Sequence, residues 1–216
     1  MASHKPKILA LCKKIASEHD GWQFIGGKFV NKIGKDVHFI INPTFTFKGS
    51  YMFFSVWGGV KLPKICKMVD KLSSLSFKIN ITINEQLHEI DLNSSTGASS
   101  FTFEGSNTDS DELIIQEIHR WINTASEYLT QKWPVDNYHT LFEAMKKHPP
   151  CYMGAYGTSL YCLAAYLGQF DFIEQYFAGE LEYADIRPIK KDTDERLLAI
   201  LPEWKAEWEK TGTIKV

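Results

Sequence analysis

Four lysines at helical spacing are the sharpest chemical feature of the sequence. Lys61, Lys64, Lys67 and Lys71 follow one another at intervals of three, three and four residues. On a helix this spacing places all four on one face, which is either simply solvated or attracts an anionic partner. The first 80 residues contain no arginine, the residue whose planar fork suits bases and phosphates. We therefore expect an acidic protein as the partner, with nucleic acid as the less favoured alternative.

Histidines and cysteines lack the spacing of a catalytic or metal site. His88, Glu89 and Asp91 suggest an acid–base or metal cluster, but neighbouring residues on a strand point to opposite faces. His139 and Cys151 suggest a nucleophilic pair, but no cationic neighbour in the sequence would activate the thiol. We therefore predict no catalytic residue, no metal site and no cofactor. A hydrolase or nuclease whose site assembles only in space remains the alternative.

Paired glycines precede the lysines. Gly58 and Gly59 follow a predicted strand and precede a predicted helix, which is where a helix N-terminus binds phosphate. The sequence has neither GxxxxGK[ST] nor GxGxxG, and paired glycines commonly form turns. We expect a turn here.

The charge is distributed unevenly along the chain. Residues 1–80 contain 13 lysines and 4 acidic residues, whereas residues 81–216 contain 11 basic and 22 acidic residues. The net charges are therefore +9 and −11. This polarity indicates either an anionic partner for the first part of the chain or attraction between the two parts.

Hydrophobic periodicity predicts the elements that position these residues. A helical period covers residues 7–19, 62–72, 114–129 and 136–147. Strand-like runs separated by glycine turns cover residues 22–25, 29–33, 37–41, 45–47, 51–57, 77–83, 87–92 and 100–104. These runs predict a mostly antiparallel sheet between residues 22 and 104, with flanking helices.

The C-terminal portion is expected to be entirely helical. Residues 148–170 contain no charged side chain, and residues 158–178 have the pattern of a buried helical hairpin that turns at Gly168 and Gln169. Residues 192–210 form an acidic helix with a kink or break at Pro202. The fold class is therefore α+β. We expect a basic domain of residues 1–106 and an acidic helical portion of residues 107–216, packed together as one unit.

Aromatic residues on the successive strands carry a family resemblance. Trp22-x-Phe24, Phe29-x-x-Lys32, Phe39-x-x-x-Pro43-x-Phe45 and Phe53-x-x-Val56 follow a leading helix. This order, over the first 130 residues, resembles a bacterial family of small α+β proteins of unknown function that is related to polymorphic-toxin immunity proteins. The resemblance implies a cytoplasmic protein that binds and blocks a toxin, and it carries over no catalytic residue.

The prediction that follows is an intracellular protein-binding module that neutralises or regulates its partner by occlusion. Its surface comprises the four lysines, with Trp57 and Tyr51 as aromatic anchors. We expect no membrane span and no secretory signal, because no apolar stretch is long enough. The cysteines Cys12, Cys66, Cys151 and Cys162 are expected to be buried free thiols in a reducing cytosol.

Overall fold

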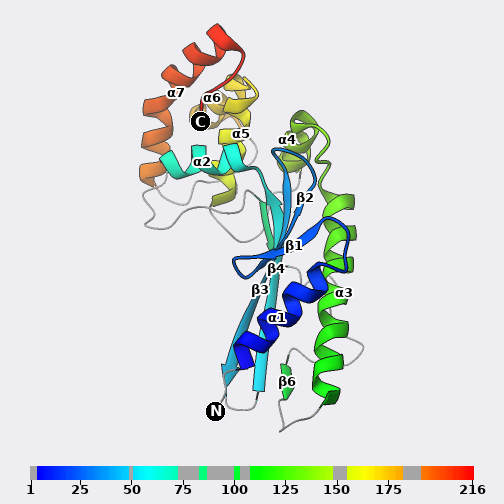
Figure 1. The fold of residues 1–216 in the computed structure, drawn as a ribbon. Coiled ribbons are helices and arrows are strands. Elements are labelled where there is room, and N and C mark those ends of the chain that lie inside the picture. The colour runs from blue at the N-terminus through cyan, green and yellow to red at the C-terminus, as the bar shows by residue number, and fades with distance from the viewer. Residues whose placement is uncertain are drawn as a thin grey trace. The chain divides into compact units, whose positions relative to one another are not determined.

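The structure is a computed structural model of the 216-residue chain. It describes residues 4–48, 51–72, 83–86, 100–102, 108–147, 155–181 and 191–216. The fold is α+β, with a mostly antiparallel sheet, flanking helices and a helical C-terminal portion, as predicted (Figure 1).

The chain divides into two compact units. The first consists of residues 1–59 and 85–132, and the second of residues 60–84 and 133–216. These bounds differ from the expected division after residue 106. The reason is that the chain leaves the first unit, adds α2 to the second and then returns.

Seven helices and six strands lie in the described residues. The helices are α1 (His4–Ala16), α2 (Pro63–Leu72), α3 (Thr108–Lys132), α4 (Tyr138–Lys147), α5 (Ala155–Tyr166), α6 (Phe170–Ala178) and α7 (Lys191–Thr211). The strands are β1 (Trp22–Ile25), β2 (Lys28–Lys32), β3 (His38–Lys48), β4 (Tyr51–Lys61), β5 (Ile83–Gln86) and β6 (Ser100–Thr102).

The strands form one sheet in the order β1-β2-β3-β4-β5, with β6 also paired to β4. The pairs β1–β2, β2–β3 and β4–β6 are antiparallel. Gly26 and Gly27 connect β1 to β2 with φ values of 59° and 81°. Two consecutive positive φ angles are the requirement of a tight hairpin turn, which explains the paired glycines here.

Two strands are longer than the sequence predicts. The runs 37–41 and 45–47 belong to a single strand, β3, which continues through Pro43. The β2 pairing ends at Ile41, so the missing N–H of Pro43 interrupts no bond to β2. Gly58 and Gly59 lie buried inside β4 and not in a turn before a helix, so the phosphate alternative has no helix N-terminus at these glycines.

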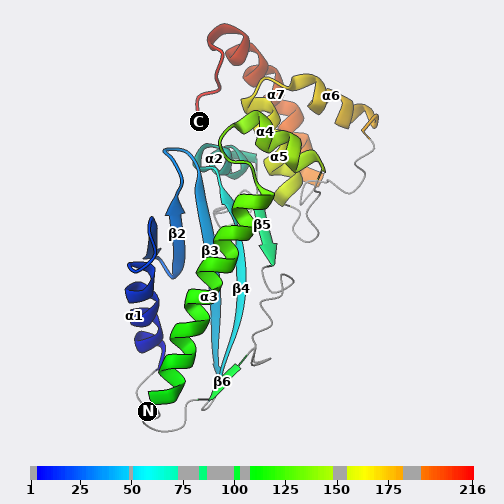
Figure 2. The same cartoon turned by 90° about the vertical axis from the view of Figure 1, so that its right-hand side faces the viewer.

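Within the first unit, α3 lies across one face of the sheet and α1 lies beside it (Figures 1 and 2). The predicted apolar stripe of α3 is buried at every position: Ile114, Ile118, Trp121, Ile122, Ala125 and Leu129. Phe39 and Ile41 are buried on β3, and the ring of Phe45 on the same face lies 6.2 Å from that of Trp121. The core of this unit therefore lies between α3 and β3.

In the second unit, α2 and α7 both pack against α5. The predicted helical hairpin is confirmed as α5 and α6, which are joined through Leu167, Gly168 and Gln169. Leu160, Leu163 and Ala164 are completely buried. The acidic helix is also confirmed, but it is not broken at Pro202, because α7 is continuous from Lys191 to Thr211.

Several predicted features lie outside the described residues. They are residues 77–82 and 87–92, the cluster His88, Glu89 and Asp91, and Cys151. Among the helices that the structure describes, none has the length and apolar character needed to cross a membrane.

Candidate functional site

The candidate site is the basic face of α2, a short amphipathic helix. Its inner face consists of Ile65, Cys66, Met68, Val69 and Leu72, all of them buried. Lys67 and Lys71, one turn apart, are exposed on the opposite face. Because the buried face is packed against α5 and α7, α2 holds these two ammonium groups on a rigid support.

The other two predicted lysines differ from this arrangement. Lys64 is half-buried, and its Nζ donates a hydrogen bond to the Tyr166 hydroxyl at 3.0 Å. The same ammonium lies 5.5 Å from the centre of the Tyr166 ring, a cation–π distance. Lys61 is the last residue of β4, not a helical residue, and it is half-buried. The four lysines therefore do not share one helix face, because the helix begins only at Pro63.

The two predicted aromatic anchors belong to the first unit, whereas α2 belongs to the second. Trp57 is half-buried on β4. The backbone of Tyr51 pairs with Thr102 of β6, and its side chain lies outside the described residues. The exposed basic face is thus defined by Lys67 and Lys71, with Lys64 at its edge.

The fold redistributes the charge of the sequence. The first unit contains 10 basic and 12 acidic residues, and the second contains 14 of each. The polarity between the two ends of the sequence therefore does not appear as a difference between the units. The fold brings basic residues of the early sequence next to acidic residues of the later sequence. For example, Lys7 of α1 forms an ion pair with Asp111 of α3 at 2.7 Å.

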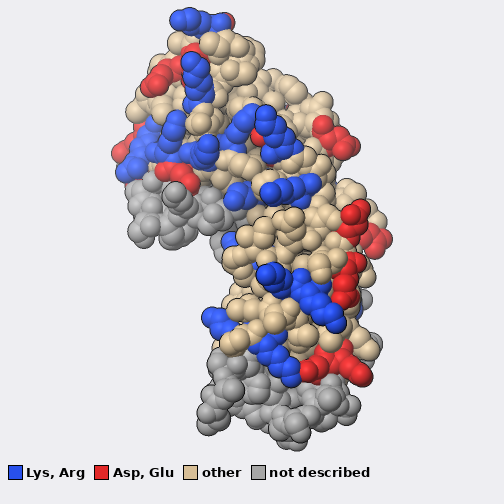
Figure 3. All heavy atoms as spheres, in the orientation of Figure 1, with Lys and Arg blue, Asp and Glu red and all other residues tan. Residues whose placement is uncertain are grey.

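The basic character of α2 nevertheless persists locally. Its ten residues contain three lysines and one acidic residue, Asp70. On the face of the protein seen in Figure 3, basic side chains gather over α2 and the neighbouring part of α7. Because salt screens distant charges, an anionic surface at short range responds to the local positive charge of α2 and not to the net charge of the unit.

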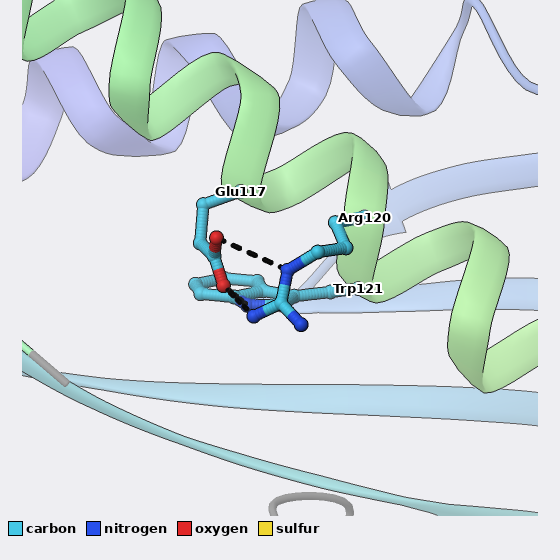
Figure 4. Close-up of polar contacts among 3 residues, drawn as sticks. All are labelled: Glu117, Arg120 and Trp121. Atoms are coloured by element: carbon cyan, nitrogen blue, oxygen red, sulfur yellow. Dashed lines mark hydrogen bonds and ion pairs between the residues drawn. The ribbon is translucent and has the colours of Figure 1, made fainter. Parts of the chain in front are cut away.

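A second polar cluster lies on α3 in the first unit (Figure 4). The Glu117 carboxylate, in a residue only 8% exposed, accepts hydrogen bonds from the guanidinium of Arg120 and, at 3.2 Å, from the indole Nε1 of Trp121. Three donors on one carboxylate compensate for its burial. This cluster holds the Trp121 ring in place above the sheet, and its carboxylate is occupied by partners of its own helix.

A third polar cluster was not apparent from the sequence. His19 Nε2 lies 2.7 Å from His119 Nδ1, and His119 Nε2 lies 3.5 Å from the Glu18 carboxylate. The two histidines are 100 residues apart and meet only because α1 packs on α3. No local spacing could have indicated this pair, since helix packing alone brings the rings together.

The described cysteines have the character of structural thiols and not of reactive ones. Cys12, Cys66 and Cys162 are free and buried, as expected. Burial raises the pKa of the Cys12 thiol to about 12, and it also raises the pKa of Cys162. A protonated, buried thiol is a poor nucleophile and a poor metal ligand. His139, the proposed partner of Cys151, is exposed on α4.

Within the described ranges, no group of three or more histidine, cysteine or acidic side chains has the geometry to hold a metal ion. Comparisons of the chain with protein-family models, with curated proteins and with solved structures found no match.

Proposed function

We propose that this protein is a binding module that recognises an acidic partner protein through the exposed basic face of α2. The observation that carries the proposal is the position of Lys67 and Lys71, exposed on a helix whose other face is buried. Fixed positive charges on a rigid support accelerate encounter with an anionic surface and disfavour basic competitors. Lys64 adds its charge at the edge of this face while Tyr166 holds its ammonium.

Such binding suits a protein that neutralises or regulates its partner by occlusion. Occlusion needs a rigid scaffold and a surface that fits the partner. The packing of α2 on α5 and α7 provides a rigid scaffold, and the exposed lysines would meet an acidic partner. The resemblance carried by Trp22, Phe24 and the aromatic residues that follow supports a toxin as the partner and the cytoplasm as the place where the two meet. The proposal rests on the lysines of α2 and not on Trp57 or Tyr51.

Zero-length amine–carboxyl cross-linking tests this proposal without any substitution. The full-length protein is cross-linked in extract of the cells that produce it, and mass spectrometry identifies which lysines are joined to which carboxylates. We expect Lys67 and Lys71 to be joined to aspartates or glutamates of one other protein. Lys13 and Lys14, exposed in the last turn of α1, serve as the internal reference. The captured protein is then purified and must form the same cross-links with the purified chain.

Two results would contradict the proposal. One is a set of cross-links spread equally over Lys13, Lys14, Lys67 and Lys71, which would indicate reaction according to exposure alone. The other is a purified partner that fails to reproduce the cross-links. Protection of Lys67 and Lys71 by added nucleic acid, but not by the protein partner, would favour a nucleic-acid binder instead.

A further inference from the structure

Within the first unit, polar contacts join α1 and its following turn to α3 at two levels. Near the beginning of both helices, Lys7 pairs with Asp111 at 2.7 Å. Immediately after α1, His19 Nε2 meets His119 Nδ1 at 2.7 Å. Both contacts advance in the same direction along the two helices, so α1 and α3 are parallel.

His19 is placed where the chain turns from α1 into β1. Its backbone N–H donates to the carbonyl of Ala16 at 3.3 Å, and its carbonyl accepts from the N–H of Trp22 at 3.1 Å. We call residues 17–22 the corner. The backbone of His19 is hydrogen-bonded on both sides, so the His19 side chain has a fixed place in this corner. Its ring contacts that of His119, with the ring centres 4.9 Å apart.

The contact between the two rings limits how many protons they can carry. A nitrogen–nitrogen distance of 2.7 Å requires one N–H and one lone pair. In the neutral pair, His119 can present Nε2–H toward Glu18 and accept at Nδ1 from His19. One added proton is compatible with the contact, because His119 then donates from both nitrogens, to Glu18 and to His19. A second proton places hydrogen on both facing nitrogens and brings two cations together.

We propose that His19 and His119 form a pH-sensitive latch, which holds the corner of residues 17–22 on α3 while the pair carries at most one proton and releases the corner when both rings are protonated. This role follows from geometry, because the facing nitrogens bond to each other and do not converge on a common ion. Consistent with this, the described residues contain no cluster of three or more metal ligands.

The surroundings of His19 are consistent with a latch that is closed at neutral pH and opens in acid. Burial lowers the pKa of His19, the positive charge on His119 lowers it further, and Glu18 opposes both effects. Glu18 from the corner and His119 from α3 are the titratable groups that act on His19 within the described residues. From β2, the neutral amide of Asn31 lies against Gly21 in the same corner.

The lowered pKa fixes the sign of the pH dependence. The released corner binds a proton more readily than the latched corner, so acid favours release. The latch is at full strength above the ordinary histidine pKa of about 6.5 and weakens as the pH falls through the pKa of latched His19. Ile8, Cys12, Ile15 and Ala16 of α1 are buried independently of the two rings, so we expect release to be local to the corner.

Hydrogen exchange of backbone amides tests the latch. The amides of His19 and Trp22 are hydrogen-bonded in the corner and report its opening. After correction for intrinsic exchange, we expect their opening constant to rise about fivefold from pH 7.5 to pH 5.0, which corresponds to loss of one hydrogen bond of about 1 kcal/mol. His119→Gln should clearly reduce this rise, since glutamine does not titrate and only the burial of His19 then opposes its protonation. His139→Gln, at an exposed histidine of α4, should retain it.

A second measurement keeps the inference testable if His119→Gln fails to fold. Ring resonances of the unsubstituted protein are followed by NMR between pH 8 and pH 4.5, and we expect His19 to titrate below the ordinary histidine pKa of about 6.5. Two independent titrations at the pKa of exposed histidine would overturn the latch. The same pH dependence of exchange in His119→Gln and in the unsubstituted protein would also overturn it.

Discussion

At the scale of the residue, Gly168 packs closely against Trp208 in the second unit. A Cβ built on Gly168 would lie 2.3 Å from the Trp208 ring, and Gly168 has a φ of 73°. Both facts require glycine at the turn between α5 and α6. Gly179 has nearly the same φ, 72°, but open space around it. The two positions therefore separate the cost of backbone conformation from the cost of a steric clash.

We predict that Gly168→Ala destabilises the protein more than Gly179→Ala does. The left-handed conformation costs alanine about 1–2 kcal/mol at either position. The clash with a rigid indole adds about 1–3 kcal/mol at position 168 alone. Urea unfolding at neutral pH measures the difference in free energy. Equal losses of stability in the two variants would show that the ring moves away without cost.

A second prediction concerns the buried carboxylate of α3. Glu117→Ala removes the acceptor of the Arg120 guanidinium and of the Trp121 indole, and should cost about 2–3 kcal/mol of unfolding free energy. Glu117→Gln should cost less, because its amide oxygen still accepts from the indole. Glu112→Ala, at an exposed position of α3, should change stability by no more than about 0.5 kcal/mol. A loss no greater in Glu117→Ala than in Glu112→Ala would refute the stabilising role of this cluster.

At the scale of the element, hydrophobic period predicts most of what the structure contains. The stripe of α3 and the inner face of α2 follow from the 3.6-residue repeat, because each of these two helices buries a single face. The helix α5 is buried at every residue from 157 to 165, so it follows from the charge-free stretch of sequence and not from a single apolar face. The hydrophobic period predicts wrong element boundaries where a proline is tolerated inside a strand or helix. Pro43 continues in β3 beyond the last β2 pair, and Pro202 continues in α7 at an exposed position.

The candidate site is only partly predictable at this scale. The spacing of Lys67 and Lys71 places both on the outer face of α2, as the structure shows. Lys64 has the same spacing but is held by Tyr166, 102 residues further along the chain. His19 and His119 are likewise brought together by packing. Contacts of this kind depend on the relative position of helices, which a single sequence does not display.

The burial of α5 gives the prediction at this scale. Leu163 is completely buried, so Leu163→Asp places a charge in apolar surroundings and should cost about 3–5 kcal/mol. Leu198→Asp, at a leucine of α7 that is 49% exposed, should change stability by about 0.5 kcal/mol or less. Thermal melts of both variants measure the contrast. If Leu163→Asp does not fold, Leu163→Ala, expected to cost about 2–5 kcal/mol, replaces it.

At the scale of the whole molecule, charge distribution is the feature with functional consequences. The sequence is strongly basic at one end and acidic at the other, but each compact unit contains nearly equal numbers of basic and acidic residues. The ion pair between Lys7 and Asp111 shows that part of the polarity is neutralised within the fold. Lys67 and Lys71 remain exposed, and the proposed binding function requires that these two charges attract a partner.

The rate of association with an anionic polypeptide measures this most directly. Fluorescently labelled poly-L-glutamate is the probe, and stopped-flow kinetics are recorded at low and at physiological ionic strength. Three proteins are compared: the unsubstituted chain, Lys67→Glu/Lys71→Glu, and Lys13→Glu/Lys14→Glu. The last is a matched control, because it has the same change in net charge and also replaces two exposed lysines of a helix.

We predict that Lys67→Glu/Lys71→Glu slows association at low ionic strength by about tenfold or more, that the control slows it far less, and that salt removes the difference. The melting temperatures of both variants should fall by small amounts, because Lys71, like Lys13 and Lys14, lies in the last turn of its helix, where a positive charge is favourable. Equal slowing in the two variants would contradict the account, since net charge and not the face of α2 would then control binding. A large drop in melting temperature confined to Lys67→Glu/Lys71→Glu, with unchanged association, would contradict it as well, because the lysines would then act within the fold.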